Sequence, residues 1–442
     1  MDNLLARETG CCVMPFMMDL KNRLPKGGFL HNVLTLMTGT AIAQAIPILI
    51  SPILTRLYTP EDFGLLALYI SVVSLISVIV TARYEIAIML PKQDEDAANL
   101  GALSLSIAVI ISALTVLIVL FFNVPIAGLL RKPEIAQWLY LVPLAVLAVG
   151  IYQIINYWST RRNLYRRLAA ARVTQSVANG SVNLGLGFAH MGVSGLILGH
   201  LAGQVLSAGV LVRQAWPDVQ KYRSVVRWDR MHRNAQVYQD FPKVNSLQAF
   251  VDILQSSGVV FLISSFFGSV VLGFYSFTLR ILQAPLGLLG ASVSQVFYQK
   301  ASEVYKNSGD LQGLVKKTIL SLAAMALPVF LILALFAPPI FGFIFGEEWW
   351  EAGTYAQILV PWLFLNFIVS PISQVPIIVG EQKKNFLFAL VGNSLIILSV
   401  IYGGIIAHNI KMGFYILSGS ISVYYLVVIL WIFKISKKKA GI

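Results

Sequence analysis

The sequence is poor in charge and nearly devoid of cysteine. Only 12% of its 442 residues are charged, against about 25% in a typical soluble domain. Its two cysteines, Cys11 and Cys12, are adjacent, which excludes a disulfide framework. Spacings typical of zinc sites, glycine-rich phosphate loops and Ser/His/Asp arrangements are lacking as well. These absences exclude a soluble protein or a disulfide-rich scaffold, and they predict a protein without a metal or cofactor.

The chain has long apolar runs instead, and its mean hydropathy is +0.75. A membrane helix needs about 20 mostly apolar residues to cross roughly 30 Å of hydrocarbon. Twelve stretches meet this requirement, which predicts an all-α, polytopic membrane protein with 12 transmembrane helices. They are 32–55, 64–82, 98–122, 136–158, 169–189, 192–212, 245–267, 270–295, 316–345, 354–379, 385–407 and 413–433.

The basic residues orient these helices. Lys and Arg in short loops favour the cytoplasmic side of a membrane. With both termini cytoplasmic, the cytoplasmic segments hold 28 of the 33 Lys and Arg residues and the outer loops hold four. This count includes Arg172, Lys316 and Lys317, which lie in the first turn of their predicted helices, and the one basic residue that it leaves deeper within a helix is Arg280. The sequence therefore predicts twelve spans with both termini in the cytoplasm.

The net charge of +13 could by itself suggest a nucleic-acid partner. Basic residues scattered over short loops between apolar helices instead match the anionic lipids of the cytoplasmic surface. We therefore predict membrane lipids as partners and no nucleic acid.

Short segments recur along the chain in the same order. Leu57–Gly64 recurs as Phe266–Gly273, and Pro125–Gly128 recurs as Pro339–Gly342, with offsets of 209 and 214. Each copy contains six predicted helices, so the copies share one orientation. Parallel repeats of this kind are typical of alternating-access transporters.

The repeat predicts two pseudo-symmetric six-helix lobes around a central cavity. The predicted boundaries are a cytoplasmic segment at 1–31, an N-terminal lobe at 32–213, an inter-lobe connection at 214–244, a C-terminal lobe at 245–433 and a basic cytoplasmic tail at 434–442.

Polar residues form stripes on three predicted helices. Polar side chains in hydrocarbon are costly, and ionisable ones usually face a bundle interior or a water-filled cavity. At 100° per residue each set falls on one face of its helix. The sets are Thr40, Gln44, Pro47 and Ser51; then Asn245, Gln248, Asp252 and Gln255; and then Ser276, Arg280, Gln283, Gly287, Gly290 and Ser294.

Arg280 is the sharpest single candidate, because a guanidinium stays charged at ordinary pH. One interpretation is a structural ion pair with Asp252. Another is a cavity cation that binds an anionic group such as a phosphate through bidentate hydrogen bonds. Asp252 could alternatively be a proton or sodium site. Arg83 and Glu85 are better explained as a local pair at the cytoplasmic edge.

Several motifs resemble the polysaccharide or O-antigen flippase branch of the multidrug/oligosaccharidyl-lipid/polysaccharide (MOP, MATE-like) exporter superfamily. They are Thr55–Gly64, Arg83–Ala87, Asp252–Ser256 and Gly273–Arg280, followed by Pro285 and Ser294–Phe297. The resemblance covers roughly residues 30–435. In related lipid II flippases, cavity arginines bind cargo, including one on the eighth helix, where Arg280 falls. Those relatives also carry charged residues on the first helix, whereas 32–55 has none.

The resemblance implies a multi-pass protein of the bacterial inner membrane and not an enzyme. It would move an undecaprenyl-diphosphate-linked oligosaccharide, such as an O-antigen or capsule repeat unit, from the cytoplasmic to the periplasmic leaflet. In this interpretation Arg280 engages the diphosphate, a proton or sodium gradient supplies direction, and contact with a polysaccharide polymerase stays open. The residues expected to contact sugar or to stabilise the cavity are Asp252, Gln255, Gln283, Gln248 and Gln44.

Two alternatives stay open. A MATE-like multidrug or cation antiporter would need acidic cavity residues, of which Asp252 is the unambiguous one. A membrane-embedded polysaccharide polymerase or ligase would be expected to place catalytic residues on a large outer loop, whereas the predicted outer loops are short.

Overall fold

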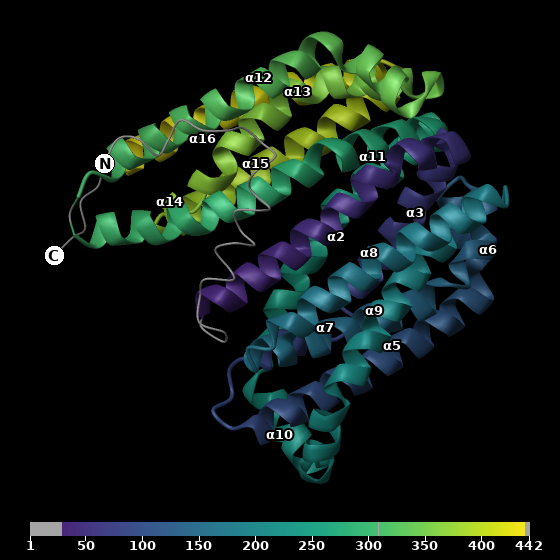
Figure 1. Ribbon diagram of the computed structural model, residues 1–442, viewed down its shortest axis with the longest axis vertical. Coiled ribbons are helices and arrows are strands. Elements are labelled where there is room, and N and C mark those ends of the chain that lie inside the picture. Colours follow the sequence, from purple (N-terminus) through teal and green to yellow (C-terminus); the bar gives the residue numbers. More distant parts are fainter. Residues whose placement is uncertain (1–28, 308, 438–442) are drawn as a thin grey trace. The chain divides into compact units, whose positions relative to one another are not determined.

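The structure is a computed structural model that describes residues 29–307 and 309–437 (Figure 1). Cys11, Cys12 and most of the predicted terminal segments lie outside these residues. All regular elements in the described ranges are helical. The α-helices are α2 (Phe29–Leu57), α3 (Pro60–Ser77), α4 (Tyr84–Ala87), α5 (Asp94–Leu129), α6 (Ala136–Leu139), α7 (Val142–Arg161), α8 (Tyr165–Phe188), α9 (Val193–Tyr222), α10 (Trp228–Val237), α11 (Ser246–Lys306), α12 (Leu311–Phe345), α13 (Trp350–Ile372), α14 (Val375–Ile378), α15 (Gln382–Ile401) and α16 (Ile410–Ile435).

Ten helical stretches of the described residues are long and apolar enough to cross a membrane. The all-α, multi-pass prediction is thereby confirmed, while the count of twelve and the side of the termini stay predictions. Two features account for the difference in number. The predicted span 169–189 coincides with α8, a 24-residue helix that is too polar to qualify. The predicted spans 245–267 and 270–295 fall within α11, and one candidate stretch, Phe241–Ala284, runs through both.

Gly268 interrupts α11 between those two predicted spans. Its backbone has φ 86° and ψ 176°, a non-helical conformation that residues with a Cβ rarely adopt. The helical run is therefore two helical parts joined at one residue, and glycine is the residue type that allows the break.

Large apolar side chains cover the outer faces of α5 and α12. Phe121 is 74% exposed and Phe343 is 86% exposed, with many exposed aliphatic neighbours on the same helices. Exposed apolar patches of this extent mark contact with lipid or with another apolar partner. These faces fit a hydrocarbon environment, as the composition predicts.

The chain divides into two compact units. Of the described residues, unit 1 comprises those up to 50 and 69–254, and unit 2 comprises 51–68 and those from 255 onward. The boundaries fall inside α2, α3 and α11, so a short piece of the N-terminal half packs with unit 2. The six-helix lobe boundaries at 32–213 and 245–433 stay predictions.

In unit 1, α8 packs on α9, α5 and α9 pack on α7, and α10 packs on α5. The predicted inter-lobe connection 214–244 is largely helical, because α9 continues to Tyr222 and α10 follows. It is also anchored. Asn99 of α5 donates to the carbonyl of Val225, and the Tyr84 hydroxyl donates to the carbonyl of Ala235.

In unit 2, α13 packs against α12 and α16, and an aromatic core surrounds Trp349. The Trp349 ring is fully buried and lies 4.4 Å from the ring of Phe277 and 5.1 Å from that of Phe63. Its indole N–H donates to the carbonyl of Thr55 at 3.1 Å. The segment 51–68 is thus fixed to unit 2 by both packing and a hydrogen bond.

The two equivalent segments of the repeat meet within unit 2. A Cβ on Gly64 would lie 1.9 Å from the carbonyl oxygen of Ser269, and a Cβ on Gly273 would lie 1.7 Å from that of Pro60. The offset of 209 that equates Gly64 with Gly273 also equates Pro60 with Ser269. A contact that exchanges equivalent residues in this way is the signature of a two-fold relation. The hydroxyl of Ser269 adds a bond to Glu61.

Arg83 and Glu85 form the predicted local pair, with 3.6 Å between Arg83 Nη1 and Glu85 Oε1. Glu85 is only 1% exposed, and its carboxylate accepts a hydrogen bond from the hydroxyl of Thr81. Burial raises the pKa of Glu85, although Thr81 and Arg83 oppose this shift. The pair is therefore more deeply buried than an interfacial contact would be.

We expect Gly64→Ala and Gly273→Ala to destabilise the protein, because either Cβ would force two backbones apart. Overpacking of this kind costs about 1–3 kcal/mol. Thermal unfolding in detergent should show a lower Tm for both variants. The matched control is Gly258→Ala, on α11, where a Cβ meets nothing within 4 Å. An unchanged Tm for Gly64→Ala would contradict the close contact.

We expect Glu85 to make stability depend on pH. Its raised pKa means that the folded state holds the proton where the unfolded state has lost it, so this contribution is present below about pH 4.3 and is lost as pH rises through the raised value. The Tm of the native protein minus that of Glu85→Gln should therefore fall between pH 4.5 and pH 8. Glu134→Gln, at an exposed glutamate, should show no such trend. A difference that stays flat would refute the raised pKa.

Candidate functional site

Arg280 lies on the part of α11 that follows Gly268. The buried side chains of Tyr275, Thr278 and Leu282 hold this helix to unit 2. The Thr278 hydroxyl donates to the carbonyl of Ala352 on α13 at 2.8 Å. With the contact at Gly273, these interactions fix the rotation of the helix, so Arg280 projects from the side opposite to its packed face.

The face of α11 that carries Arg280 is polar and open. Ser276 and Arg280 are partly exposed, whereas Gln283 and Gly287 are exposed. The ion pairs of unit 2, Lys384–Glu381 and Lys411–Glu351, involve other residues. Among the described residues of unit 2, no carboxylate lies within 4 Å of the Arg280 guanidinium. Unit 2 thus presents a cation without a counter-ion of its own.

The predicted site residues are divided between the units. Unit 2 holds Arg280, Gln283 and Gln255, and Gln255 is partly exposed. Unit 1 holds Asp252, Gln248 and Gln44. The structure brings Arg280 and Gln283 onto one helical face, and the pairing of Asp252 with Arg280 stays a prediction.

The unit 1 residues differ in their surroundings. Gln248 and Asp252 are exposed one turn apart on the first part of α11. Gln44 on α2 is partly buried, and its Oε1 is buried without a hydrogen-bond partner among the described residues. A buried oxygen of this kind is costly unless it finds a partner. Gln44 therefore retains an unused acceptor within the polar stripe of α2.

Sequence reasoning missed one residue. Arg172 counts among the cytoplasmic basic residues of the predicted topology, and on α8 its guanidinium donates to the hydroxyl of Thr40, the fifth residue of the candidate span Leu36–Leu57. The helical spacing of Arg172, Ser176 and Asn179 was a signal that could have found it, because the same criterion identifies the other stripes.

A metal site does not emerge from the described ranges, in which no group of three or more His, Cys, Asp or Glu side chains could hold an ion. The arrangement of residues is instead suited to binding by charge and hydrogen bonds, with side chains that reversibly replace water around a polar ligand.

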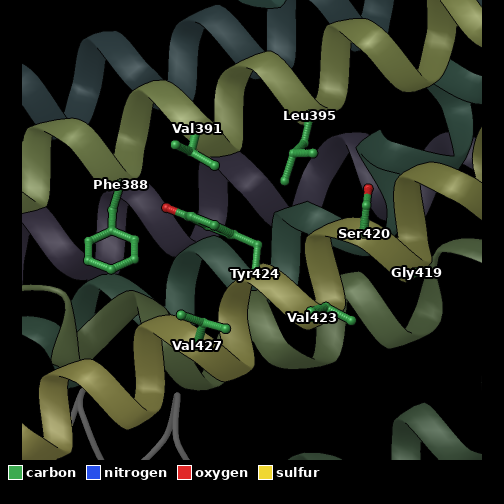
Figure 2. Close-up of a pocket in the computed structure, with 8 residues that line it drawn as sticks. All are labelled: Phe388, Val391, Leu395, Gly419, Ser420, Val423, Tyr424 and Val427. Atoms are coloured by element: carbon green, nitrogen blue, oxygen red, sulfur yellow. The ribbon is translucent and has the colours of Figure 1, made fainter.

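A shallow apolar groove of about 480 Å³ lies between α15 and α16 (Figure 2). Val391 and Leu395 of α15 face Val423 and Tyr424 of α16 across it. None of the predicted site residues lines this groove. Its apolar walls suit a hydrocarbon chain and not a charged or sugar ligand.

The sequence profile of a family described as "Polysaccharide biosynthesis protein" matches residues 53–354. The chain belongs to this family. The match spans the Gly64 and Gly273 segments, α8, Asp252 and Arg280, so it includes most of the residues that the motifs singled out. No curated protein matches the chain.

Solved structures of MOP superfamily transporters share the fold. An inward-facing multidrug resistance MATE family transporter matches with TM-score 0.59 and 16% identity, over 97% of this chain and 100% of that one. The outward-facing form matches with TM-score 0.56 and 15% identity, over 98% and 100%. The lipid II flippase MurJ, in an inward closed conformation, matches with TM-score 0.63 and 14% identity, over 92% and 90%.

These findings confirm the resemblance that the motifs indicated. The protein is a multi-pass membrane protein with the MOP transporter fold, in a polysaccharide biosynthesis family. Its fold is the one that these MATE and MurJ structures share.

We expect Gln283 to face water and Phe343 to face lipid, although both are exposed. In a background with Cys11→Ser and Cys12→Ser, Gln283→Cys should react with a charged, membrane-impermeant maleimide, because the reactive thiolate forms in water. Phe343→Cys should not react. Labelling of right-side-out and inverted vesicles measures this, and equal reactivity of the two variants would contradict a polar, water-lined face on α11.

Proposed function

We propose that the protein is a flippase for an undecaprenyl-diphosphate-linked oligosaccharide. It moves the repeat unit of an O-antigen, capsule or similar polysaccharide from the cytoplasmic to the periplasmic leaflet of a bacterial inner membrane. Membership of a polysaccharide biosynthesis family and the MOP transporter fold both support this proposal.

The observation that carries it is Arg280. A transporter of cationic drugs needs acidic residues at its site, whereas unit 2 presents a guanidinium with no carboxylate within 4 Å among its described residues. A guanidinium is planar, always charged and matched to bidentate bonds with phosphate oxygens. Arg280 therefore engages the diphosphate of the cargo.

The remaining polar residues serve the sugars. Each hydroxyl or charge of a sugar diphosphate would be desolvated at a cost of several kcal/mol in bare hydrocarbon. Amide side chains at Gln44, Gln248, Gln255 and Gln283 donate and accept hydrogen bonds, so they replace the lost water. The polyprenyl chain stays in lipid, which removes any need to desolvate it.

Movement follows from the two halves of the repeat. Rocking of two similar lobes about a central site exposes that site to one leaflet and then to the other. A proton or sodium gradient supplies direction, and Asp252, an exposed carboxylate on α11, is the acid placed to sense it.

A MATE-like antiporter for drugs or cations is the second candidate, and Asp252 is the observation that favours it. One exposed carboxylate on α11 could bind a cationic substrate, as acidic residues in a low-dielectric site attract cations. The flippase requires the positive charge of Arg280, whereas the antiporter requires the negative charge of Asp252. Variants that remove one charge or the other therefore distinguish the two candidates.

We expect Arg280→Gln to abolish most polysaccharide export in a strain that lacks the native gene, because the variant keeps a similar side-chain length but loses the charge. Loss of a charge-assisted bidentate contact should lower transport about tenfold or more. Surface polysaccharide, quantified by immunoblot against equal membrane levels of protein, measures the effect. Arg280→Lys should retain part of the activity, because it keeps the charge.

The matched control is Arg131→Gln, at an exposed arginine between α5 and α6, which should export normally. Full export by an Arg280→Gln protein that inserts normally would remove Arg280 from the mechanism. Normal export by a strain that lacks the protein, together with a drug or cation efflux defect that Asp252→Asn also produces, would favour the antiporter.

A further inference from the structure

Helix α8 carries a polar stripe outside the residues assigned above. Arg172, Ser176, Asn179 and Asn183 follow one another at spacings of four, three and four residues. At 100° per residue these spacings confine the four side chains to about 60° of the helix. The stripe explains why α8 falls below the hydropathy of a membrane span, and it makes α8 the most polar long helix of unit 1.

This helix packs directly along α2. A Cβ on Gly39 would lie 2.5 Å from the Cβ of Ala169, so the two backbones are close at that level. Four residues further along α2 and seven further along α8, the Ser176 hydroxyl donates to the carbonyl of Ala43 at 2.5 Å. The contact runs in the same direction along both helices, and it places Arg172 and Ser176 beside the stripe of α2, whereas Asn179 and Asn183 lie against Gly203 and Gly199 of α9.

Arg172 joins the two stripes. Its Nη1 donates to the hydroxyl oxygen of Thr40 at 2.5 Å, and that hydroxyl donates its own proton to the carbonyl of Leu36. Because its proton is used in the bond to Leu36, the Thr40 hydroxyl can only accept a hydrogen bond from Arg172. A guanidinium has five N–H donors, so this bond uses one of them.

Three partly buried arginines near Arg172 have a carboxylate partner, whereas Arg172 has none within the described part of its unit. Arg161 and Arg162 contact Asp94, and Arg167 contacts Asp218. Among the described residues of unit 1, no carboxylate lies within 4 Å of Arg172, and its recorded hydrogen bond is the one to Thr40. A cation beside an apolar helix that lacks a counter-ion is typical of a ligand or ion pathway.

We infer that Arg172, held in place by Thr40, is a second anion-binding residue and that its ligand is a diphosphate group. This inference rests on the proposed flippase function, because it assigns part of the same cargo to unit 1. The guanidinium binds phosphate oxygens with the N–H groups that Thr40 leaves free. Gln44, one turn further along α2, offers its unpartnered Oε1 to a hydroxyl of the attached sugar.

The arrangement also gives Thr40 a positioning role. An arginine side chain has four rotatable bonds, and fixing it in one orientation costs conformational entropy. The bond to Thr40 meets this cost before the ligand arrives, which strengthens binding by preorganisation. Removal of the Thr40 hydroxyl should therefore weaken binding less than removal of the charge does.

The test is binding of undecaprenyl diphosphate to the purified full-length protein in detergent, measured as ligand-dependent stabilisation across a concentration series. Inorganic pyrophosphate and undecaprenol are run in parallel, because they separate the diphosphate from its lipid. We expect Arg172→Gln to weaken undecaprenyl diphosphate binding about tenfold to 100-fold. Arg172→Lys and Thr40→Val should cause smaller losses. Stabilisation by pyrophosphate alone would show that the headgroup suffices.

The matched control is Arg166→Gln, on the same helix at an exposed arginine, which should bind normally. If Arg172 only ties α8 to α2, Arg172→Gln will lower the Tm of the ligand-free protein and leave the affinity unchanged. That outcome overturns the inference. The proposed function would still stand if the native protein binds undecaprenyl diphosphate and Arg280→Gln loses polysaccharide export. If the native protein binds neither diphosphate, the proposed function and the inference fail together.

Discussion

The rest of unit 2 depends on the backbone contact between two glycine segments. Gly64 lies against Ser269 and Gly273 against Pro60 at distances that leave no space for any side chain. Because these segments are the two copies of one repeat, the glycine of each copy leaves space for the backbone of the other copy. The contact draws residues 51–68 into unit 2, where Thr55 receives the indole N–H of Trp349 and Phe63 packs on the same ring. The helix that bears Arg280 starts at this contact, so its direction and rotation are set here.

Five arginines, Arg161, Arg162, Arg167, Arg172 and Arg280, fall into two groups by their contacts. Arg161, Arg162 and Arg167 contact carboxylates at the ends of α5 and α9, where they fix helices to one another. Arg172 and Arg280 lie on polar helical stripes, and neither has a carboxylate within 4 Å among the described residues of its own unit. An arginine that already has a carboxylate must exchange it to bind an anion, whereas one without it can bind at once. Among these five, the contacts therefore distinguish arginines that fix helices to one another from arginines that can bind a ligand, which a count of charges does not do.

Much of the fold could be predicted from apolar run length, because a bilayer demands about 20 apolar residues in a helix that satisfies its own backbone. The rule succeeded for α5 and α12, whose outer faces are almost wholly apolar. The rule is harder to apply to α8, which carries Arg172, Ser176 and Asn183. This helix tolerates a polar face because that face packs on α2 and α9. The break at Gly268 was visible as the boundary between two predicted spans. The sequence did not show that the break is confined to one non-helical residue, because backbone dihedrals depend on the side chains and helices that pack around them.

The sequence by itself determined the membrane-embedded helical class, the repeat and the stripe that contains Arg280, because periodicity and hydropathy are properties of the chain alone. It also supplied the motifs of the family to which the chain belongs. Only the tertiary structure decided that the repeated glycine segments touch and that Arg172 donates a hydrogen bond to Thr40. Both facts join residues more than 100 positions apart. Such contacts arise from the packing of helices against one another, which no pattern along a single helix encodes.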